Sequence, residues 1–86
     1  MATVLDYEAL VTAVAEVLGA CEDFRPRIPP VAIRAGHRLV ADLGVDSVAL
    51  LDLALGLEAR LGRPVDEADL AVLETVGDVA RHLEGR

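Results

Sequence analysis

The sequence predicts an all-α fold, a small four-helix bundle of three main helices and one short helix, with a long loop between the first two helices. Apolar residues recur at the helical period in several segments, and no segment alternates as a strand would. The hydrophobic content is 53% but only 2% of residues are aromatic, so Leu, Val and Ala must fill the seams between helices. At 86 residues, the chain is expected to form one domain over 1–86.

The first helix is expected over roughly residues 4–19, with boundaries good to a few residues. One stripe of its surface is apolar at helical spacing and consists of Tyr7, Leu10, Val11, Val14, Val17 and Leu18. Asp6 and Glu8 fall in the first turns, where the positive end of the helix dipole favours acidic side chains. Gly19 marks the end of the pattern.

Residues 20–44 are expected to form a long connection, because Pro26, Pro29 and Pro30 interrupt any helix. A loop of this length in a compact domain must be held in place. Five apolar residues are spaced as separate anchors on the core, namely Phe24, Ile28, Ile33, Leu39 and Leu43. Half of the eight basic residues lie in this loop, namely Arg25, Arg27, Arg34 and Arg38. We expect these arginines to pair mainly with nearby acids, with a second partner contact as the alternative.

The second helix is expected to begin just after Asp46 and to run to about Leu61, before Gly62 and Pro64. The predicted buried stripe consists of Leu50, Leu53, Ala54, Leu57 and Leu61. The predicted outward row consists of Val48, Asp52, Leu55 and Ala59, which places two exposed aliphatic side chains beside a carboxylate. Gly56 costs roughly 1 kcal/mol relative to Ala inside a helix, and the sequence offers no reason for it.

Two further helix starts are predicted near the C-terminus. Asp66 is expected to cap one short turn over residues 66–70. Thr75 and Asp78 have the spacing of a capping box, in which the hydroxyl and the carboxylate each accept a hydrogen bond from a free amide. The last helix is therefore expected at about residues 76–84.

Charge and composition narrow the function. Fifteen acidic residues against eight basic ones give a net charge of −7, which repels phosphate backbones, so neither nucleic acid nor a membrane surface is an expected partner. The acidic surface is either simply solvated or a docking surface for basic proteins. Cys21 is the single cysteine, no secretion signal or membrane-spanning stretch is recognisable, and we expect a cytoplasmic monomer.

The usual constellations of an enzyme are missing from the sequence. His37 and His82 have no metal-ligand spacing to a second His or Cys, so no metal site is predicted. Cys21 has no activating base nearby in sequence and is expected to be an inert, partly buried thiol. Asp66 and Glu67 resemble helix-start chemistry more than a pair of catalytic acids. No catalytic residue is predicted, and the chain is not expected to be an enzyme.

Ser47, in the segment from Asp42 to Val48, is the residue to which we assign a function. On physical grounds alone, Gly44, Asp46 and Ser47 before a helix form an ordinary helix start. A serine hydroxyl at this position is nevertheless exposed, and a phosphodiester attached to it would meet unpaired amides and the positive end of the helix dipole.

The same segment, Asp42-Leu43-Gly44-Val45-Asp46-Ser47-Val48, resembles the signature of the acyl carrier protein family, Asp-Leu-Gly-x-Asp-Ser-Leu, with Val in place of the final Leu. The resemblance continues in three segments, namely Leu57-Glu58-Ala59-Arg60-Leu61-Gly62, Val65-Asp66-Glu67 and Thr75-Val76-Gly77-Asp78-Val79. It covers nearly the whole chain and is more specific than the signature alone.

This resemblance implies that Ser47 carries 4′-phosphopantetheine taken from coenzyme A by a separate phosphopantetheinyl transferase. The implied function is a discrete carrier that presents acyl thioesters to ketosynthase, acyltransferase or acyl-activating enzymes in fatty-acid or polyketide-type biosynthesis. Asp46 would position the transferase or its metal, or cap the helix. We expect Asp46, Val48, Asp52, Leu55 and Glu58 to form the docking surface for partner enzymes.

Two features depart from the family's fatty-acid members. Ala49, Ala59 and Arg60 occupy places where acids are common, which predicts docking through aliphatic contacts more than salt bridges. The loop rich in Arg and Pro is also unusual, and both features resemble carriers of secondary metabolism such as polyketide assembly. The alternatives are a peptidyl carrier, which more often has Gly-Gly-His-Ser or Gly-Gly-Asp-Ser here, and an acidic helical adaptor that is never modified.

Overall fold

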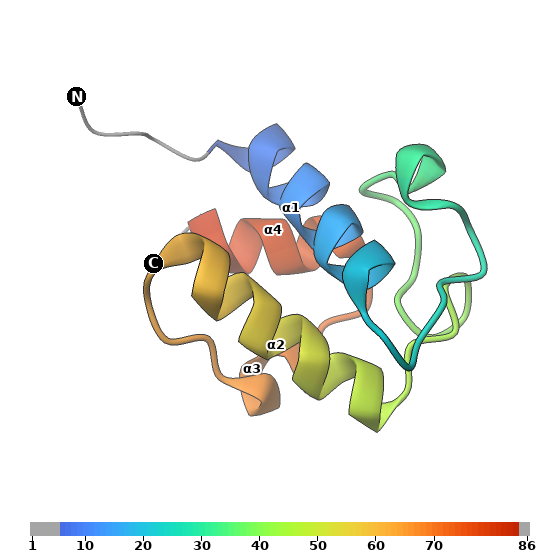
Figure 1. The fold of residues 1–86 in the computed structure, drawn as a ribbon. Helices are drawn as coiled ribbons and strands as arrows, with labels where there is room; N and C mark the ends of the chain where they lie inside the picture. The colour runs from blue at the N-terminus through green and yellow to red at the C-terminus, as the bar shows by residue number, and fades with distance from the viewer. Residues whose placement is uncertain (1–5, 85–86) are drawn as a thin grey trace.

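The computed structural model describes residues 6–84, which form four α-helices and one short 3₁₀ turn (Figure 1). The elements in chain order are α1 (Tyr7–Ala20), η1 (Pro30–Ala32), α2 (Ser47–Leu61), α3 (Glu67–Ala71) and α4 (Val76–Glu84). No strand occurs in this range, so the predicted all-α fold with a long loop after the first helix is confirmed. The 3₁₀ turn inside the loop was not predicted. None of the helices in residues 6–84 has both the length and the apolar character needed to cross a bilayer.

The start of α1 is set by Asp6. The backbone of Asp6 is extended, and its carboxylate accepts a hydrogen bond from the Ala9 amide at 2.9 Å, so Asp6 is the N-cap and Tyr7 the first helical residue. The helix thus begins within a few residues of the predicted approximate start at residue 4, and residues 4 and 5 lie outside the described range. The helix ends at Ala20, one residue later than predicted.

The other three helix starts agree with the prediction to within a residue. Asp66 caps α3 by accepting a hydrogen bond from the Ala68 amide at 2.9 Å. At the start of α4, the Asp78 amide donates to the Thr75 hydroxyl at 3.0 Å and the Thr75 amide donates to the Asp78 carboxylate at 3.1 Å. This reciprocal pair is the predicted capping box.

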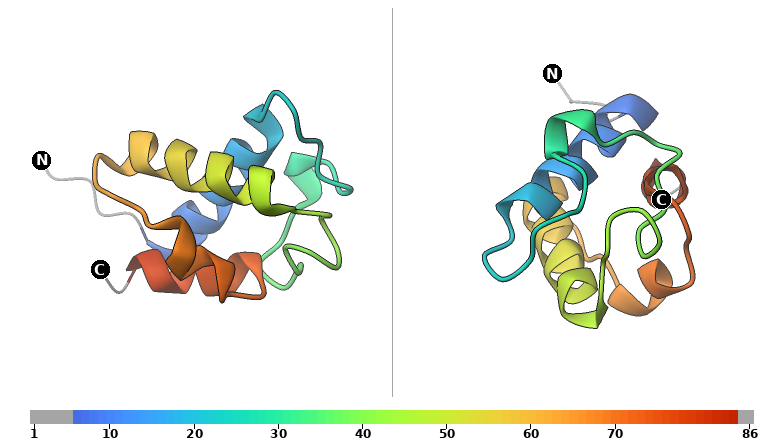
Figure 2. Two further views of the ribbon diagram at one scale, coloured as in Figure 1. Left: turned by 90° about the horizontal axis from the view of Figure 1, so that it is seen from below. Right: turned by 90° about the vertical axis from the view of Figure 1, so that its right-hand side faces the viewer.

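The helices are arranged around α1. It packs against both α2 and α4, and the short α3 packs against α2. In Figure 1 and in the left view of Figure 2, α1 and α2 run in opposite directions. The loop between them gathers at the end where α1 finishes and α2 begins, on the right of Figure 1.

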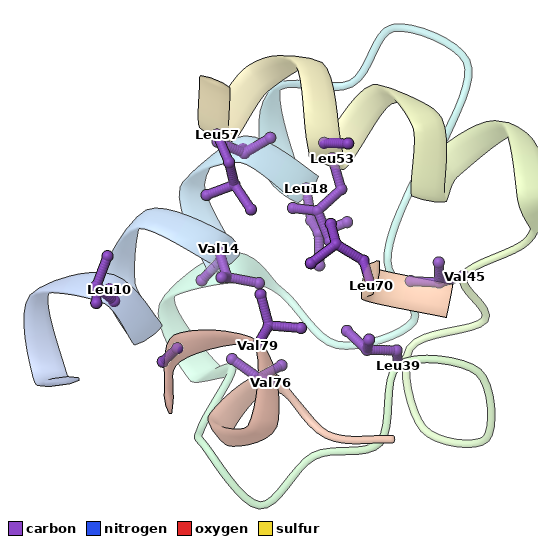
Figure 3. Packing of buried hydrophobic residues seen from close by; sticks show 14 of the residues in the cluster. Leu10, Val14, Leu18, Leu39, Val45, Leu53, Leu57, Leu70, Val76 and Val79 are labelled. Atoms are coloured by element: carbon purple, nitrogen blue, oxygen red, sulfur yellow. The ribbon is translucent and has the colours of Figure 1, made fainter. Parts of the chain in front are cut away.

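The core is built from aliphatic side chains of all four helices and the loop (Figure 3). Its fully buried members include Leu10, Val14, Leu18, Leu43, Leu53, Leu57, Leu70, Val76 and Val79. The predicted stripe of α2 needs correction, because Leu50 and Leu61 are only half-buried whereas Ala49 is completely buried. Ala49 therefore cannot occupy a surface place where an acid would be displayed to a partner.

Gly56 is explained by the close approach of α1 to α2. A Cβ atom added at Gly56 would overlap Cγ1 of Val17 and would lie 3.3 Å from its Cγ2. Val17 is buried on α1, so it cannot move aside without disturbing the core. The helix-propensity cost of glycine at this position is accepted because a side chain there would force the two helices apart.

The long loop is anchored in the way the sequence predicted. Ile33, Leu39 and Leu43 are buried, and Phe24 and Ile28 pack against the core while partly exposed. Backbone hydrogen bonds also join the loop to the start of α4, and they run from the Leu39 amide to the Glu74 carbonyl, from the Val76 amide to the His37 carbonyl and from the Gly77 amide to the Ala35 carbonyl. Such paired backbone groups hold the loop without regular secondary structure.

The expectation that the loop arginines pair with acids holds for only one of them. Arg38 contacts Asp42 at 3.4 Å. Arg34 instead donates to the carbonyl oxygens of Val31 and Ile33 at 3.0 and 3.2 Å. The remaining two arginines of the loop, Arg25 and Arg27, are exposed and have no acidic partner among residues 6–84.

Candidate functional site

The segment before α2 is held in a fixed path toward the helix. Gly44 has a φ of +77°, in the left-handed region that favours glycine. The residues on either side, Leu43 and Val45, are buried, and their amides donate to the Arg38 and Leu39 carbonyls at 3.1 and 2.9 Å. The turn at Gly44 therefore lets two neighbouring side chains enter the core and directs the next residues out to the surface.

Asp46 is the N-cap of α2. Its Oδ1 accepts a hydrogen bond from the Ala49 amide at 2.8 Å, and its carbonyl accepts the first helical bond, from Leu50, also at 2.8 Å. The carboxylate uses one oxygen for the cap, and the other has no hydrogen-bond partner among residues 6–84. Asp46 is exposed, so the free oxygen faces solvent.

Ser47 is the first residue of α2 and its side chain is exposed, as the sequence predicted. It is the only serine in the chain. The amides of Ser47 and Val48 have no acceptor within the helix, because the first turn of any helix lacks them. The hydroxyl therefore lies at the positive end of the helix dipole, beside two donors that can bind an anion.

An apolar pocket of about 250 Å³ lies beside Ser47. Its lining comes from the loop, the start of α2 and α3, and consists of Leu39, Val40, Val45, Asp46, Ser47, Leu50, Leu70, Ala71 and Leu73. Leu50 packs against the core but stays only half-buried, because it also lines this pocket. Helical spacing predicted Leu50 to be part of the buried stripe, because spacing alone does not show that a pocket opens beside a side chain.

The exposed face of α2 carries an aliphatic stripe. Val48, Leu51 and Leu55 are 59%, 45% and 54% exposed, and their spacing of three and four residues places them on one side of the helix. Val48 and Leu55 were predicted to face outward, whereas Leu51 was not singled out. Its position three residues after Val48 and four before Leu55 was the signal that could have identified it.

Asp52 and Glu58, two of the three acids expected on the docking surface, lie in different environments. Asp52 is half-buried and lines a groove between α1 and α2, together with Val17, Cys21 and Gly56. Glu58 is also half-buried, and its Oε1 accepts a hydrogen bond from the Val65 amide at 3.0 Å. Glu58 thus fastens the turn between α2 and α3, and its docking role stays a prediction.

Cys21 does not form a reactive centre. Its thiol is half-buried and donates to the Val17 carbonyl at 3.3 Å. Burial raises the pKa of the Cys21 thiol, and the nearby Asp52 carboxylate raises it further, because both disfavour a thiolate. The protonated thiol is a poor nucleophile. Among residues 6–84, no group of three or more His, Cys, Asp or Glu side chains is arranged to hold a metal ion.

Comparison with known proteins agrees with the sequence signature. The family model described as "Phosphopantetheine attachment site" matches residues 8–83. The acyl carrier protein of Thermotoga maritima is 45% identical over 47 residues, which cover 55% of this chain and 58% of that protein. The meromycolate extension acyl carrier protein of Mycobacterium leprae is 30% identical over 77 residues, covering 90% of this chain and 64% of that protein.

A third relative belongs to a much larger protein. Nonribosomal peptide synthetase 2 of Gibberella zeae is 46% identical over 44 residues, which cover 51% of this chain and 1% of that protein. The matched segments span less than two thirds of each of these three relatives.

Proposed function

The chain belongs to the acyl carrier protein family, the members of which have a phosphopantetheine attachment site, and on this premise we propose that it carries acyl groups as thioesters on 4′-phosphopantetheine attached to Ser47. The observation that carries the proposal is the exposed hydroxyl of the only serine, located on the first residue of α2. The prosthetic group supplies a long flexible arm ending in a thiol. The protein is a carrier and not a catalyst.

The residues around Ser47 fit a phosphodiester. The hydroxyl is accessible to a modifying enzyme, the first-turn amides of Ser47 and Val48 can donate to phosphate oxygens, and the helix dipole favours negative charge there. Asp46 uses one carboxylate oxygen to cap the helix and so fixes the orientation of these amides. The contribution of the chain is therefore to present the attachment point on a rigid helix start.

Attachment by an arm explains how a small protein without a catalytic group can serve several enzymes. A tether confines the acyl group near whichever enzyme has docked, which raises its effective concentration without any new contact. The modifying enzyme would be a phosphopantetheinyl transferase, and the later partners ketosynthase, acyltransferase or acyl-activating enzymes of fatty-acid or polyketide-type biosynthesis.

We place the docking surface on the exposed face of α2. The stripe of Val48, Leu51 and Leu55 supplies apolar contact next to the attachment point. Asp46 adds one exposed carboxylate at the helix start, and Asp52 adds a second, half-buried one on the side that faces α1. An aliphatic stripe with few charges predicts association that depends only weakly on salt.

The test is to incubate the apo protein with coenzyme A and a broad-specificity phosphopantetheinyl transferase and to measure its intact mass. We expect a gain of one phosphopantetheine, located on Ser47 by peptide mapping and abolished by Ser47→Ala. Thr12→Ala is the matched control, because Thr12 is an exposed hydroxyl on α1 and its loss should leave the modification unchanged. An unchanged mass would favour the helical adaptor.

The peptide synthetase match keeps a peptidyl carrier as the second candidate. The two carriers differ in what is loaded onto the thiol, an acyl group from an acyl-activating enzyme or an aminoacyl group from an amino-acid-activating enzyme. Offering both kinds of activated substrate to the holo protein and weighing the thioester separates them. Aminoacyl loading without acyl loading would refute the proposal.

A further inference from the structure

Two arginines of the described chain differ from the others in having no partner. Arg34, Arg38, Arg60 and Arg63 each bond to a carbonyl oxygen or a carboxylate, and Arg81 lies 5.5 Å from the centre of the Tyr7 ring. Within residues 6–84, Arg25 and Arg27 make no such contact. In a protein with a net charge of −7, acids are plentiful, so two unpaired guanidinium groups in one short segment require an explanation.

Arg27 is held against the segment that leads into α2. Its amide donates to the Leu43 carbonyl at 3.1 Å, and the next residue, Ile28, packs against the core. The Arg27 side chain crosses Gly44 closely: Nε lies 3.0 Å and Cζ 3.3 Å from the position that a Cβ atom would occupy. A side chain at position 44 would therefore displace the guanidinium, which is a second reason for glycine there.

The position of Arg27 places its charge near the attachment point. Gly44 is three residues before Ser47, so their Cα atoms are at most about 11 Å apart, since consecutive Cα atoms are separated by about 3.8 Å. The positive end of the α2 dipole and the unpaired guanidinium therefore lie at the same end of the molecule. Two positive groups repel each other mildly in the apo protein, and both are stabilised by an anion bound between them.

We propose that the Arg27 guanidinium binds the phosphodiester of the prosthetic group on Ser47 and thereby sets the direction in which the arm leaves the protein surface. This inference rests on the proposed function, because it requires phosphopantetheine at Ser47. Arg27 is a positioning residue. Arg25 is exposed and unpaired, and the atoms nearest Gly44 belong to Arg27 and not to Arg25, so Arg25 provides a matched control with the same charge in the same loop.

The test follows nuclear magnetic resonance signals of the full-length protein before and after modification. We expect the Nε–Hε signal of Arg27 to shift when the apo protein becomes holo, and the Nε–Hε signal of Arg25 to stay in place. The ³¹P signal of the holo protein should shift in Arg27→Gln, stay unchanged in Arg25→Gln, and return toward the original position in Arg27→Lys. The ³¹P signal of the unsubstituted holo protein should also depend on salt between about 0.01 M and 1 M, because the Debye length falls from about 30 Å to about 3 Å over this range. This dependence on salt should be smaller in Arg27→Gln.

Several outcomes would refute the inference. One is an Arg27 signal that does not respond to modification, and another is an Arg25→Gln variant that moves the ³¹P signal as much as Arg27→Gln does. Free coenzyme A added to the apo protein without a transferase tests whether its phosphates bind Arg27 when nothing is attached to Ser47. An equal shift of the Arg27 signal there would mean that the guanidinium binds those phosphates and not the diester. Failure of the proposed function is separate, because intact mass would then show no phosphopantetheine on Ser47.

Discussion

Gly56→Ala tests the packing that holds α2 in place. The change adds one methyl group to the middle of the helix that carries Ser47 at its start. Alanine favours a helix over glycine by about 1 kcal/mol, so a sequence-based argument expects the variant to be more stable. The structure predicts the opposite, because the new Cβ would overlap a methyl carbon of Val17 on α1.

The size of the effect follows from two opposing terms. Forcing an extra methyl group into a packed interface costs about 1–3 kcal/mol, against the gain of about 1 kcal/mol in helix propensity. We therefore expect Gly56→Ala to lower the free energy of unfolding by about 1 kcal/mol. In a domain of this size, such a loss lowers the melting temperature by about 4–8 °C.

Denaturant unfolding followed by circular dichroism measures this difference. Ala59→Gly is the control, because Ala59 is exposed on the same helix and its replacement reports the propensity term alone, a loss of about 1 kcal/mol. Adding Val17→Ala to Gly56→Ala should recover part of the loss, since the smaller side chain makes room for the new methyl group. If Gly56→Ala instead raised stability by as much as Ala59→Gly lowers it, the close contact between α1 and α2 would be refuted.

Substitutions at three further residues test the cap of α2, the docking surface and the capping box of α4. Asp46→Ala should lower stability by about 1 kcal/mol through loss of the helix cap. Asp46→Asn should preserve the cap and the stability but slow the transferase reaction. Equal modification rates for the Asn variant and the unsubstituted protein would exclude a role for the charge. Asp52→Arg should reduce turnover by partner enzymes, because it reverses the charge of a half-buried carboxylate beside the exposed face of α2; unchanged turnover with every partner would exclude Asp52 from the docking surface. The amide of Thr75 holds the pKa of the Asp78 carboxyl below its ordinary value, so this carboxylate contributes stability above about pH 4 that is lost as pH falls through its lowered pKa. Asp78→Asn should flatten the acid side of the stability profile, and an unaltered profile would assign the acid sensitivity to other groups.

The sequence predicted best those features that depend on neighbouring residues. Asp46, Asp66 and Thr75 start helices because each accepts a hydrogen bond from an amide two or three residues later, and that spacing is visible in the sequence. Ser47 directly follows the Asp46 cap, and its predicted exposure at the start of the helix is confirmed. The Ser47 hydroxyl could therefore be located without the fold.

Features that depend on contacts between distant segments were predicted less well. Gly56 had no explanation until Val17 was seen to approach it across 39 positions of sequence. Leu50 was predicted to be part of the buried stripe, but it also lines a pocket together with Leu70 and Leu73, and helical periodicity alone does not show that a pocket lies beside it. The sequence showed four arginines in the loop but not which of them would pair with an acidic side chain.

Arg27 shows that the residues around Ser47 can be identified only from the fold, whereas Ser47 itself can be identified from the sequence. Ser47 is identified by residues within a few positions of it, but Arg27 is twenty positions earlier and reaches the same end of the molecule only because its amide bonds to Leu43 and its side chain crosses Gly44. Gly44 thus has two functions, a left-handed turn and an open path for a guanidinium. Gly44→Ala should affect both, lowering stability through strain at a positive φ and moving the Arg27 Nε–Hε signal in the apo protein. If Gly44→Ala lowered stability without moving that signal, the position of the Arg27 guanidinium would not depend on the absence of a side chain at position 44.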